Sequence, residues 1–207
     1  MTADRKKHWE TLYRTKKPGE VSWYREHLDS SLKMILAAGL PPDARIIDIG
    51  GGDSTLVDDL LSRGFKNISV LDISVTALAA AKTRLGLRSE KVNWIEADIT
   101  AVDLPSNSFD LWHDRAVFHF LTDAGSRRKY IELVKRAVKP GGHVIIATFG
   151  PGGPDKCSGL DVIRYGAEKM HGTFGNSFEL MNCFDESHHT PFGTTQEFIY
   201  CYCRKIR

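Results

Sequence analysis

The sequence predicts an α/β protein built on a doubly wound, mainly parallel seven-stranded sheet that ends in an antiparallel β-hairpin. Short apolar runs alternate with helical patterns along most of the chain, which is typical of βαβ units around a parallel sheet. The last two apolar runs are joined by a connection too short for a crossover helix, so these strands should pair antiparallel. Strands are expected at residues 45–49, 66–73, 92–97, 109–114, 143–149, 178–187 and 196–204.

The expected helices are bounded by residues that end helices or turn the chain. The helix at 55–62 is followed by Gly64, and the Ala-rich helix at 75–85 by Gly86. Glycine readily adopts the left-handed conformation that ends a helix. A charged amphipathic helix at 124–138 is broken by the Lys-Pro-Gly-Gly that follows it. Two further helices are expected at residues 29–38 and 160–169.

Composition and charge disfavour several classes of function. A chain of 207 residues suits one domain, and 28 Lys+Arg against 26 Asp+Glu gives a net charge of +2, too small to indicate a nucleic-acid or membrane partner. No apolar run approaches the ~20 residues that span a bilayer, and no secretory pattern opens the sequence, so we expect a cytoplasmic protein. The four cysteines form no Cys-x-x-Cys pair, so we expect reduced thiols and no metal.

A glycine run follows the first expected strand, in Asp48-Ile-Gly-Gly-Gly-Asp-Ser. Ligands of open parallel sheets bind beyond the carboxyl ends of the strands, where glycine lets the backbone approach closely. A dinucleotide fingerprint starting at Gly50 finds Gly52 but then Thr55 in place of its third glycine. Asp48 precedes the run where a pyrophosphate would lie, and a carboxylate repels phosphate. A cationic cofactor without phosphate, such as S-adenosylmethionine (SAM), fits better.

Acidic residues recur at the ends of the next three expected strands. Asp72 ends the second strand, 72 − 48 = 24 residues after Asp48, where its carboxylate can accept both hydroxyls of a ribose. Asp98 follows the third strand, placed to accept a hydrogen bond from an adenine amino group beside the apolar Ile99. Asp114 ends the fourth strand, near the expected donor methyl. Each acid alone is also explained as a helix cap or turn residue, but four at successive strand ends predict one cofactor site.

These segments together resemble the class I, Rossmann-like, SAM-dependent methyltransferases. The resemblance covers residues 44–149 and rests on the glycine run, Asp72-Ile-Ser, Ala97-Asp-Ile, the loop at 103–110 and Val138-Lys-Pro-Gly-Gly. It implies a seven-stranded sheet and a methyltransferase that converts SAM to S-adenosylhomocysteine (SAH). Ser54 departs from the pattern, since many members have a third glycine there. The expected cofactor-binding residues are Asp48, Gly50, Gly52, Asp72, Ile73, Asp98, Ile99, Asp114 and Trp23.

A shorter resemblance concerns Leu111-Trp-His-Asp-Arg-Ala, which is similar to the Trp-Asp-Arg-Gly-Ala motif of thiopurine S-methyltransferases. It is also similar to the Asp-Lys-Gly motif of the lysine methyltransferases that modify elongation factors and citrate synthase. The aromatic arm with Trp9, Tyr13 and Trp23 resembles the arms of both groups. Trp9 and Trp23 could close over a sulfonium by cation–π contact, or could only pack the arm down.

The resemblance implies a single methyltransferase domain over residues 1–207. Residues 1–40 would form the aromatic arm and a helix, 44–149 the SAM-binding core, and 150–207 the acceptor-side region and terminal hairpin.

Methyl transfer depends mainly on holding the two reactants in line and excluding water, and a strong base is needed only for a protonated acceptor. The catalytic candidates are Asp114 and His119, although His119 could instead be a packing residue. Arg115 could bind an anionic acceptor or pair with Asp114. The acceptor-side candidates are Tyr24, Arg115, Arg164 and Tyr165.

The sequence favours a small-molecule acceptor, such as a thiol or another soft nucleophile, because the chain is short and has no recognition domain. Protein lysine methylation is the alternative within the same enzyme class. A nicotinamide-dependent oxidoreductase and a non-catalytic SAM-binding protein are the alternatives of other classes. The basic run Arg127-Arg-Lys129 reads as a solvated helix face, so no nucleic-acid partner is expected. The acceptor itself and the oligomeric state are not encoded in these patterns.

Overall fold

In the computed structural model, which describes residues 2–206, seven strands form a sheet in the order β3-β2-β1-β4-β5-β9-β8. The strands β1 to β5 run parallel, and β9 is antiparallel to its neighbours β5 and β8. The strands are β1 (Arg45–Ile49), β2 (Asn67–Asp72), β3 (Val92–Glu96), β4 (Phe109–Arg115), β5 (Val138–Phe149), β8 (Phe178–His189) and β9 (Thr195–Lys205). The doubly wound sheet with a C-terminal antiparallel hairpin is therefore confirmed.

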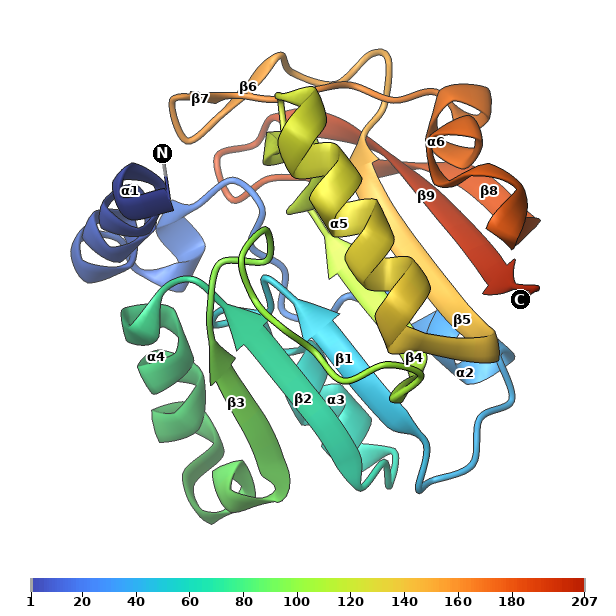
Figure 1. Cartoon of the computed structure of the whole chain (residues 1–207). Helices are drawn as coiled ribbons and strands as arrows, with labels where there is room; N and C mark the ends of the chain where they lie inside the picture. The colour runs from blue at the N-terminus through green and yellow to red at the C-terminus, as the bar shows by residue number, and fades with distance from the viewer. Residues whose placement is uncertain (1, 207) are drawn as a thin grey trace.

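Helices cover both faces of this sheet (Figure 1). Two buried apolar clusters, one on each face, fix them in place, because each helix buries one apolar side against the strands. One face carries α2 (Asp29–Ala37), α3 (Leu56–Ser62) and α4 (Val75–Leu85), and the other carries α5 (Ala124–Ala137) and α6 (Ala167–Phe174). Short 3-10 turns lie at Pro18–Glu20, Gly86–Lys91, Phe118–Phe120 and Gly175–Ser177.

The strand order reverses between β1 and β4, which are neighbours although β2 and β3 lie between them in sequence. In open α/β sheets, ligands bind beyond the carboxyl ends of the strands at such a reversal. The N-terminal helix α1 (Thr2–Thr15) lies beyond this edge of the sheet, beside α4 (Figure 1). The fold thus leaves the expected site between the strand ends and the N-terminal arm. Among the described residues, no helix is both long and apolar enough to cross a bilayer.

One helix prediction is wrong, and one helix was not predicted. The helix expected at 160–169 is wrong, because residues 156–161 form a small hairpin of β6 (Lys156–Cys157) and β7 (Leu160–Asp161). Its turn residues Ser158 and Gly159 both have positive φ, which a helix does not allow, and α6 begins only after Gly166. The helix α1 was not anticipated, because its sequence is largely polar and shows little apolar periodicity.

Candidate cofactor and acceptor site

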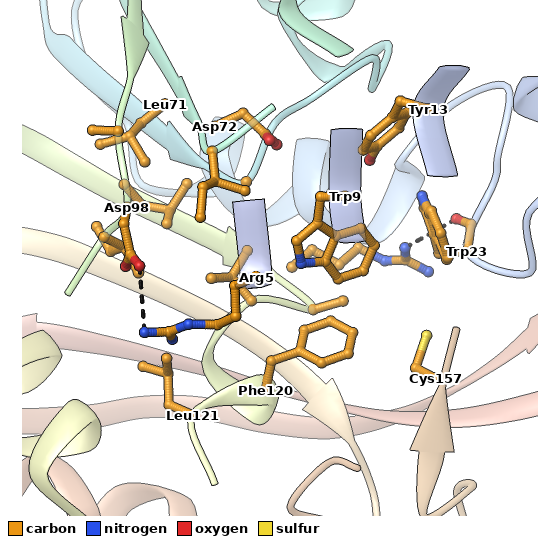
Figure 2. A pocket seen from close by; sticks show the side chains of 18 residues that line it. Arg5, Trp9, Tyr13, Trp23, Leu71, Asp72, Asp98, Phe120, Leu121 and Cys157 are labelled. Atoms are coloured by element: carbon orange, nitrogen blue, oxygen red, sulfur yellow. Dashed lines mark hydrogen bonds and ion pairs between the residues drawn. The ribbon is translucent and has the colours of Figure 1, made fainter. Parts of the chain in front are cut away.

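Two adjoining hollows open at the carboxyl ends of β1, β2 and β4. The cofactor cleft is the hollow lined by residues that include Trp9, Tyr13, Asp72, Asp98, Val117 and Phe120 (Figure 2). The side cavity is the hollow lined by residues that include Tyr24, Arg25, Asp48, Gly51, Asp53 and His113. Both are bounded by Tyr13, Trp23, Ile49, Gly50 and Arg115, so the two hollows share a wall.

Asp72 ends β2, as predicted, and lines the cofactor cleft. Its Oδ1 accepts the Ser74 N–H at 2.8 Å, and the side chain is largely buried. Burial, together with smaller contributions from the nearby carboxylates of Asp53 and Asp48, raises the pKa of Asp72 to about 7. The crowding of acids around the glycine run makes this region unfavourable for a pyrophosphate. The second oxygen, Oδ2, faces Gly52.

Asp98 presents an unsatisfied oxygen to the same cleft. Its Oδ1 accepts hydrogen bonds from the Thr100 N–H and hydroxyl, at 2.8 and 2.7 Å. Its Oδ2 is buried and receives no hydrogen bond, although the Arg5 guanidinium lies 3.3 Å away (Figure 2). A buried carboxylate oxygen of this kind needs a donor, and the amino group of an adenine would supply one. Ile73 and Ile99 line the same cleft and provide apolar contact for a flat ring.

The glycine run gives the backbone close access to the cleft. Gly50 and Gly52 have φ of 66° and 46°, in the left-handed region that glycine adopts without strain. A Cβ at Gly52 would lie 3.0 Å from the Tyr13 hydroxyl and 3.1 Å from Asp72 Oδ2. The space above the loop is therefore available only because these residues lack side chains.

Asp48 lines the side cavity, and its carboxylate turns away from the cofactor cleft. Its Oδ1 lies 2.7 Å from His113 Nδ1, and its Oδ2 faces Gly51. Of the four acids expected around one cofactor, Asp72 and Asp98 line the cleft, and Asp48 lies behind the glycine loop.

Residues 47–146 match the profile of a family described as a methyltransferase domain. The chain contains a class I SAM-dependent methyltransferase domain. The carboxylate of Asp72, the unsatisfied Asp98 oxygen and the glycine loop fit SAM, which is the cofactor of this domain.

Several curated proteins are similar over this part of the chain. EEF1A lysine methyltransferase 4 of Mus musculus is 30% identical over 105 residues, which are 50% of this chain and 40% of that protein. Malonyl-[acyl-carrier protein] O-methyltransferase of Paenibacillus sp. (strain JDR-2) is 32% identical over 117 residues, 55% of this chain and 41% of that protein. The chain thus spans less than half the length of either relative.

Solved structures share the fold at low sequence identity. N-methyltransferase NodS from Bradyrhizobium japonicum WM9, in complex with SAH, has a TM-score of 0.67 at 18% identity, over 86% of this chain and 87% of that one. The [4+2]-cyclase SpnF has a TM-score of 0.69 at 17% identity, over 92% of this chain and 84% of that one. Since one neighbour is described as a cyclase, the fold alone does not identify the reaction.

Asp114 does not line either hollow of the methyltransferase domain, so the prediction that it lies at the donor methyl is corrected. Its side chain is fully buried on the α5 face. Oδ1 accepts the N–H groups of Val117 and Phe118, and Oδ2 accepts the Tyr130 hydroxyl. Burial raises the pKa of Asp114 to about 6. Asp114 therefore fixes the turn after β4, whose residues Arg115 and Val117 line the cleft.

His119, the second catalytic candidate, is also fully buried and lines neither hollow. Burial lowers the pKa of His119 to about 3, so its imidazole is neutral at physiological pH. Its Nδ1 accepts the Phe149 N–H at 3.3 Å, and its ring packs against Phe120. This is the packing role that the sequence left open.

The four acceptor-side candidates divide into two pairs. Tyr24 and Arg115 line the side cavity, and Arg115 also lines the cofactor cleft. Arg164 instead donates to the carbonyls of Pro151 and Gly153, and Tyr165 is buried against Phe118, so neither reaches the hollows. The expected placement of Arg164 and Tyr165 is therefore corrected: Arg164 holds the loop after β5, and Tyr165 packs in the core on the α5 face.

The helix α1 supplies one cleft residue that the sequence analysis missed, Arg5, beside Trp9 and Tyr13 of the aromatic arm. Arg5, Trp9 and Tyr13 line the cofactor cleft at spacings of four residues, which place them on one side of a helix. That spacing was the available signal. Trp9 contacts Trp23 and Phe120 edge-on, with ring centroids 5.8 and 5.1 Å apart. The arm is thus packed over the cleft (Figure 2).

Glu10 fastens this arm to α4. Its carboxylate accepts the N–H groups of Val75 and Thr76 and the Thr76 hydroxyl, at the N-terminus of that helix. We expect Glu10→Ala to lower the free energy of unfolding by about 1 kcal/mol, the usual effect of losing a helix cap, and to speed amide exchange in α1. The exposed Glu90 is the control: Glu90→Ala should change neither. Unchanged exchange in Glu10→Ala would contradict this role.

Proposed function

We propose that this protein transfers the methyl group of SAM to a small-molecule acceptor that carries a thiol or another soft nucleophile. When bound, SAM supplies a methyl group activated by a positively charged sulfur. The side cavity, which adjoins the cofactor cleft through a shared wall, is the proposed acceptor site. Tyr24 and Arg115 would contact the acceptor there.

The observation that carries this proposal is the state of Arg115. Its Nε donates to the Tyr200 hydroxyl and its Nη1 to the Trp23 carbonyl, while its buried Nη2 has no hydrogen-bond partner and lies 4.0 Å from a Glu186 oxygen. The positive charge of Arg115, which lines the side cavity and is only loosely paired with Glu186, favours an electron-rich atom such as a thiolate and lowers the pKa of a thiol. It disfavours a lysine ammonium.

The other residues would act by position. Trp9, Trp23 and Phe120 exclude water from the cleft, which supports an in-line displacement between two held reactants. For Asp114 and His119 we propose positioning roles, because both hold the segment that carries Arg115 and Val117 without lining the cleft. A thiolate acceptor needs no general base. The cytoplasm remains the predicted compartment.

Protein lysine methylation is the second candidate, favoured by the similarity to lysine methyltransferases of elongation factor 1A. Incubation of the protein and a cell extract with tritiated SAM separates the two. We expect label in low-mass products that thiol-blocking reagents abolish. Label in a discrete protein band would instead establish a protein acceptor, and failure of the purified protein to bind SAH by calorimetry would overturn the methyltransferase assignment.

A further inference from the structure

A chain of buried hydrogen bonds crosses the α2 face of the sheet. His113 Nδ1 lies 2.7 Å from Asp48 Oδ1, and His113 Nε2 lies 2.8 Å from Ser31 Oγ. Ser31 Oγ lies 3.3 Å from the Tyr200 hydroxyl, which accepts Arg115 Nε at 3.1 Å. Ser31 and Tyr200 have no exposed surface, and His113 has 1%. We call these five residues the buried chain.

The two ends of the buried chain have fixed hydrogen-bonding roles. Arg115 can only donate, so the Tyr200 hydroxyl accepts from it, and the Asp48 carboxylate can only accept, so His113 Nδ1–H donates to it. The hydroxyls of Ser31 and Tyr200 can each donate one hydrogen bond and accept another, which makes the chain continuous between these ends. Hydrogen bonds linked in this way polarise one another, and loss of one member leaves buried groups unpaired on both sides.

One end of the buried chain lies beneath the glycine loop, and the other lies at the wall that the two hollows share. Asp48 lies directly beneath the glycine loop, since a Cβ at Gly51 would come within 2.6 Å of Asp48 Oδ2. At the other end, Arg115 lines both hollows and binds the Trp23 carbonyl in the segment before α2. The small Ala147 lies between Arg115 and Tyr200 in the strand register, which leaves room for their contact.

Two other roles for this arrangement are excluded by geometry and chemistry. Ser31, His113 and Asp48 have the connectivity of a hydrolytic triad, but Ser31 is fully buried and already contacts Tyr200, so no substrate reaches its hydroxyl. The chain cannot carry a proton out to solvent either, because it ends on a guanidinium that stays protonated. Both ring nitrogens of His113 are already hydrogen-bonded within the buried chain, which leaves the fixing of side-chain positions as its role.

We infer that His113 is a positioning residue that links the two sites: through Asp48 it fixes the glycine loop, and through Ser31 and Tyr200 it fixes Arg115 against Trp23. The inference rests on the proposed function, since it concerns the same cleft and side cavity. It adds that the affinity for SAM and the ordering of residues 21–28, which include Trp23, depend on the same set of hydrogen bonds. A change at Ser31, which lines neither hollow, should then affect both.

The test is Ser31→Ala, read by SAH calorimetry and by amide exchange of residues 21–28. We expect SAH affinity to fall about tenfold, the equivalent of one net hydrogen bond, and exchange of the segment to accelerate. Tyr200→Phe removes only the hydroxyl and keeps the ring stacked on Phe184, so it tests the chain if Ser31→Ala fails to fold. Tyr200→Phe should accelerate the same amide exchange. Ser31→Thr, which keeps a hydroxyl at this position, should have the SAH affinity that Ser31→Ala loses.

Two matched controls separate this role from general destabilisation. Ser69 is a buried serine on β2 that accepts a hydrogen bond from Asn93, and Tyr202 lies two residues from Tyr200 with its hydroxyl on His143. Ser69→Ala and Tyr202→Phe should keep wild-type SAH affinity and exchange of residues 21–28. If Ser31→Ala and Tyr200→Phe both keep wild-type SAH affinity and amide exchange, the inference about His113 is overturned and the proposed function stands. A wild-type protein that does not bind SAH would overturn the proposed function.

Discussion

Replacement of Asp72 by asparagine will weaken SAH binding about 100-fold, because a carboxylate can accept both ribose hydroxyls and a carboxamide oxygen replaces only part of that contact. A hydrogen bond to a charged group contributes about 1.5–3 kcal/mol, and about 2.7 kcal/mol corresponds to a factor of about 100 in affinity. Calorimetric titration with SAH measures the effect. In the wild type, affinity should rise as the pH increases through about 7, where Asp72 ionises.

The same variant will make the ligand-free protein more stable above pH 7. Burial raises the pKa of Asp72 to about 7 in the folded state, against 3.8 in the unfolded chain. Between these values the folded state retains a proton that the unfolded state has lost, so the free energy of unfolding falls as the pH rises. A shift of about three units corresponds to roughly 4 kcal/mol at most. Asparagine does not ionise and avoids this loss.

Asp110 provides the control for Asp72. Its carboxylate lies at the opposite end of the sheet, bonded to Lys139 and to the Arg45 N–H. Asp110→Asn should keep SAH affinity and lose stability. Asp72→Asn should lose SAH affinity, and urea unfolding should show a larger gain in its stability at pH 8 than at pH 5. Retention of wild-type SAH affinity by Asp72→Asn would contradict the assignment of the ribose contact.

The strands and the cofactor acids were predictable because both depend on local sequence. A central parallel strand is buried on both faces and therefore reads as a mostly apolar run, as in β1, where Ile46, Ile47 and Ile49 flank Asp48. Parallel strands also bring their carboxyl ends to one edge of the sheet, and this alone predicts that Asp72 and Asp98 share a cleft, as they do. The apolar pattern and strand direction were sufficient for these residues.

Asp114 and His113 show what sequence could not predict. Neighbouring side chains of a strand point to opposite faces, and the partner on each face comes from a distant segment: Tyr130 of α5 for Asp114, and Ser31 of α2 for His113. The acidic residue at the strand end was therefore given the functional role, while the histidine beside it was passed over. Helix α1 was missed for a related reason, since Glu10 and Arg5 hold it through residues 65 and 93 positions further along the chain.

Gly50→Ala should be strongly destabilising for two separable reasons. Gly50 has φ of 66°, where an alanine costs about 1–2 kcal/mol. The new Cβ would also lie 2.0 Å from Val117 Cγ2, so Val117 or the loop must move, at a further cost of about 1–3 kcal/mol. Both Gly50 and Val117 line the cofactor cleft, and we therefore expect SAH affinity to fall at least tenfold as well.

A double-mutant cycle with Val117→Ala separates the two causes, because that change removes the clashing methyl group and leaves the backbone conformation as it is. Gly50→Ala/Val117→Ala should be more stable than the sum of the single changes predicts, by about 1 kcal/mol or more in urea unfolding. Gly39 isolates the backbone effect, since it has φ of 65° and nothing within 4 Å of its Cβ position. Two results together would contradict this account. Gly50→Ala would lower the free energy of unfolding no more than Gly39→Ala does, and adding Val117→Ala to Gly50→Ala would recover neither stability nor SAH affinity. The packing of the turn after β4 on the glycine loop would then not be what shapes the cleft.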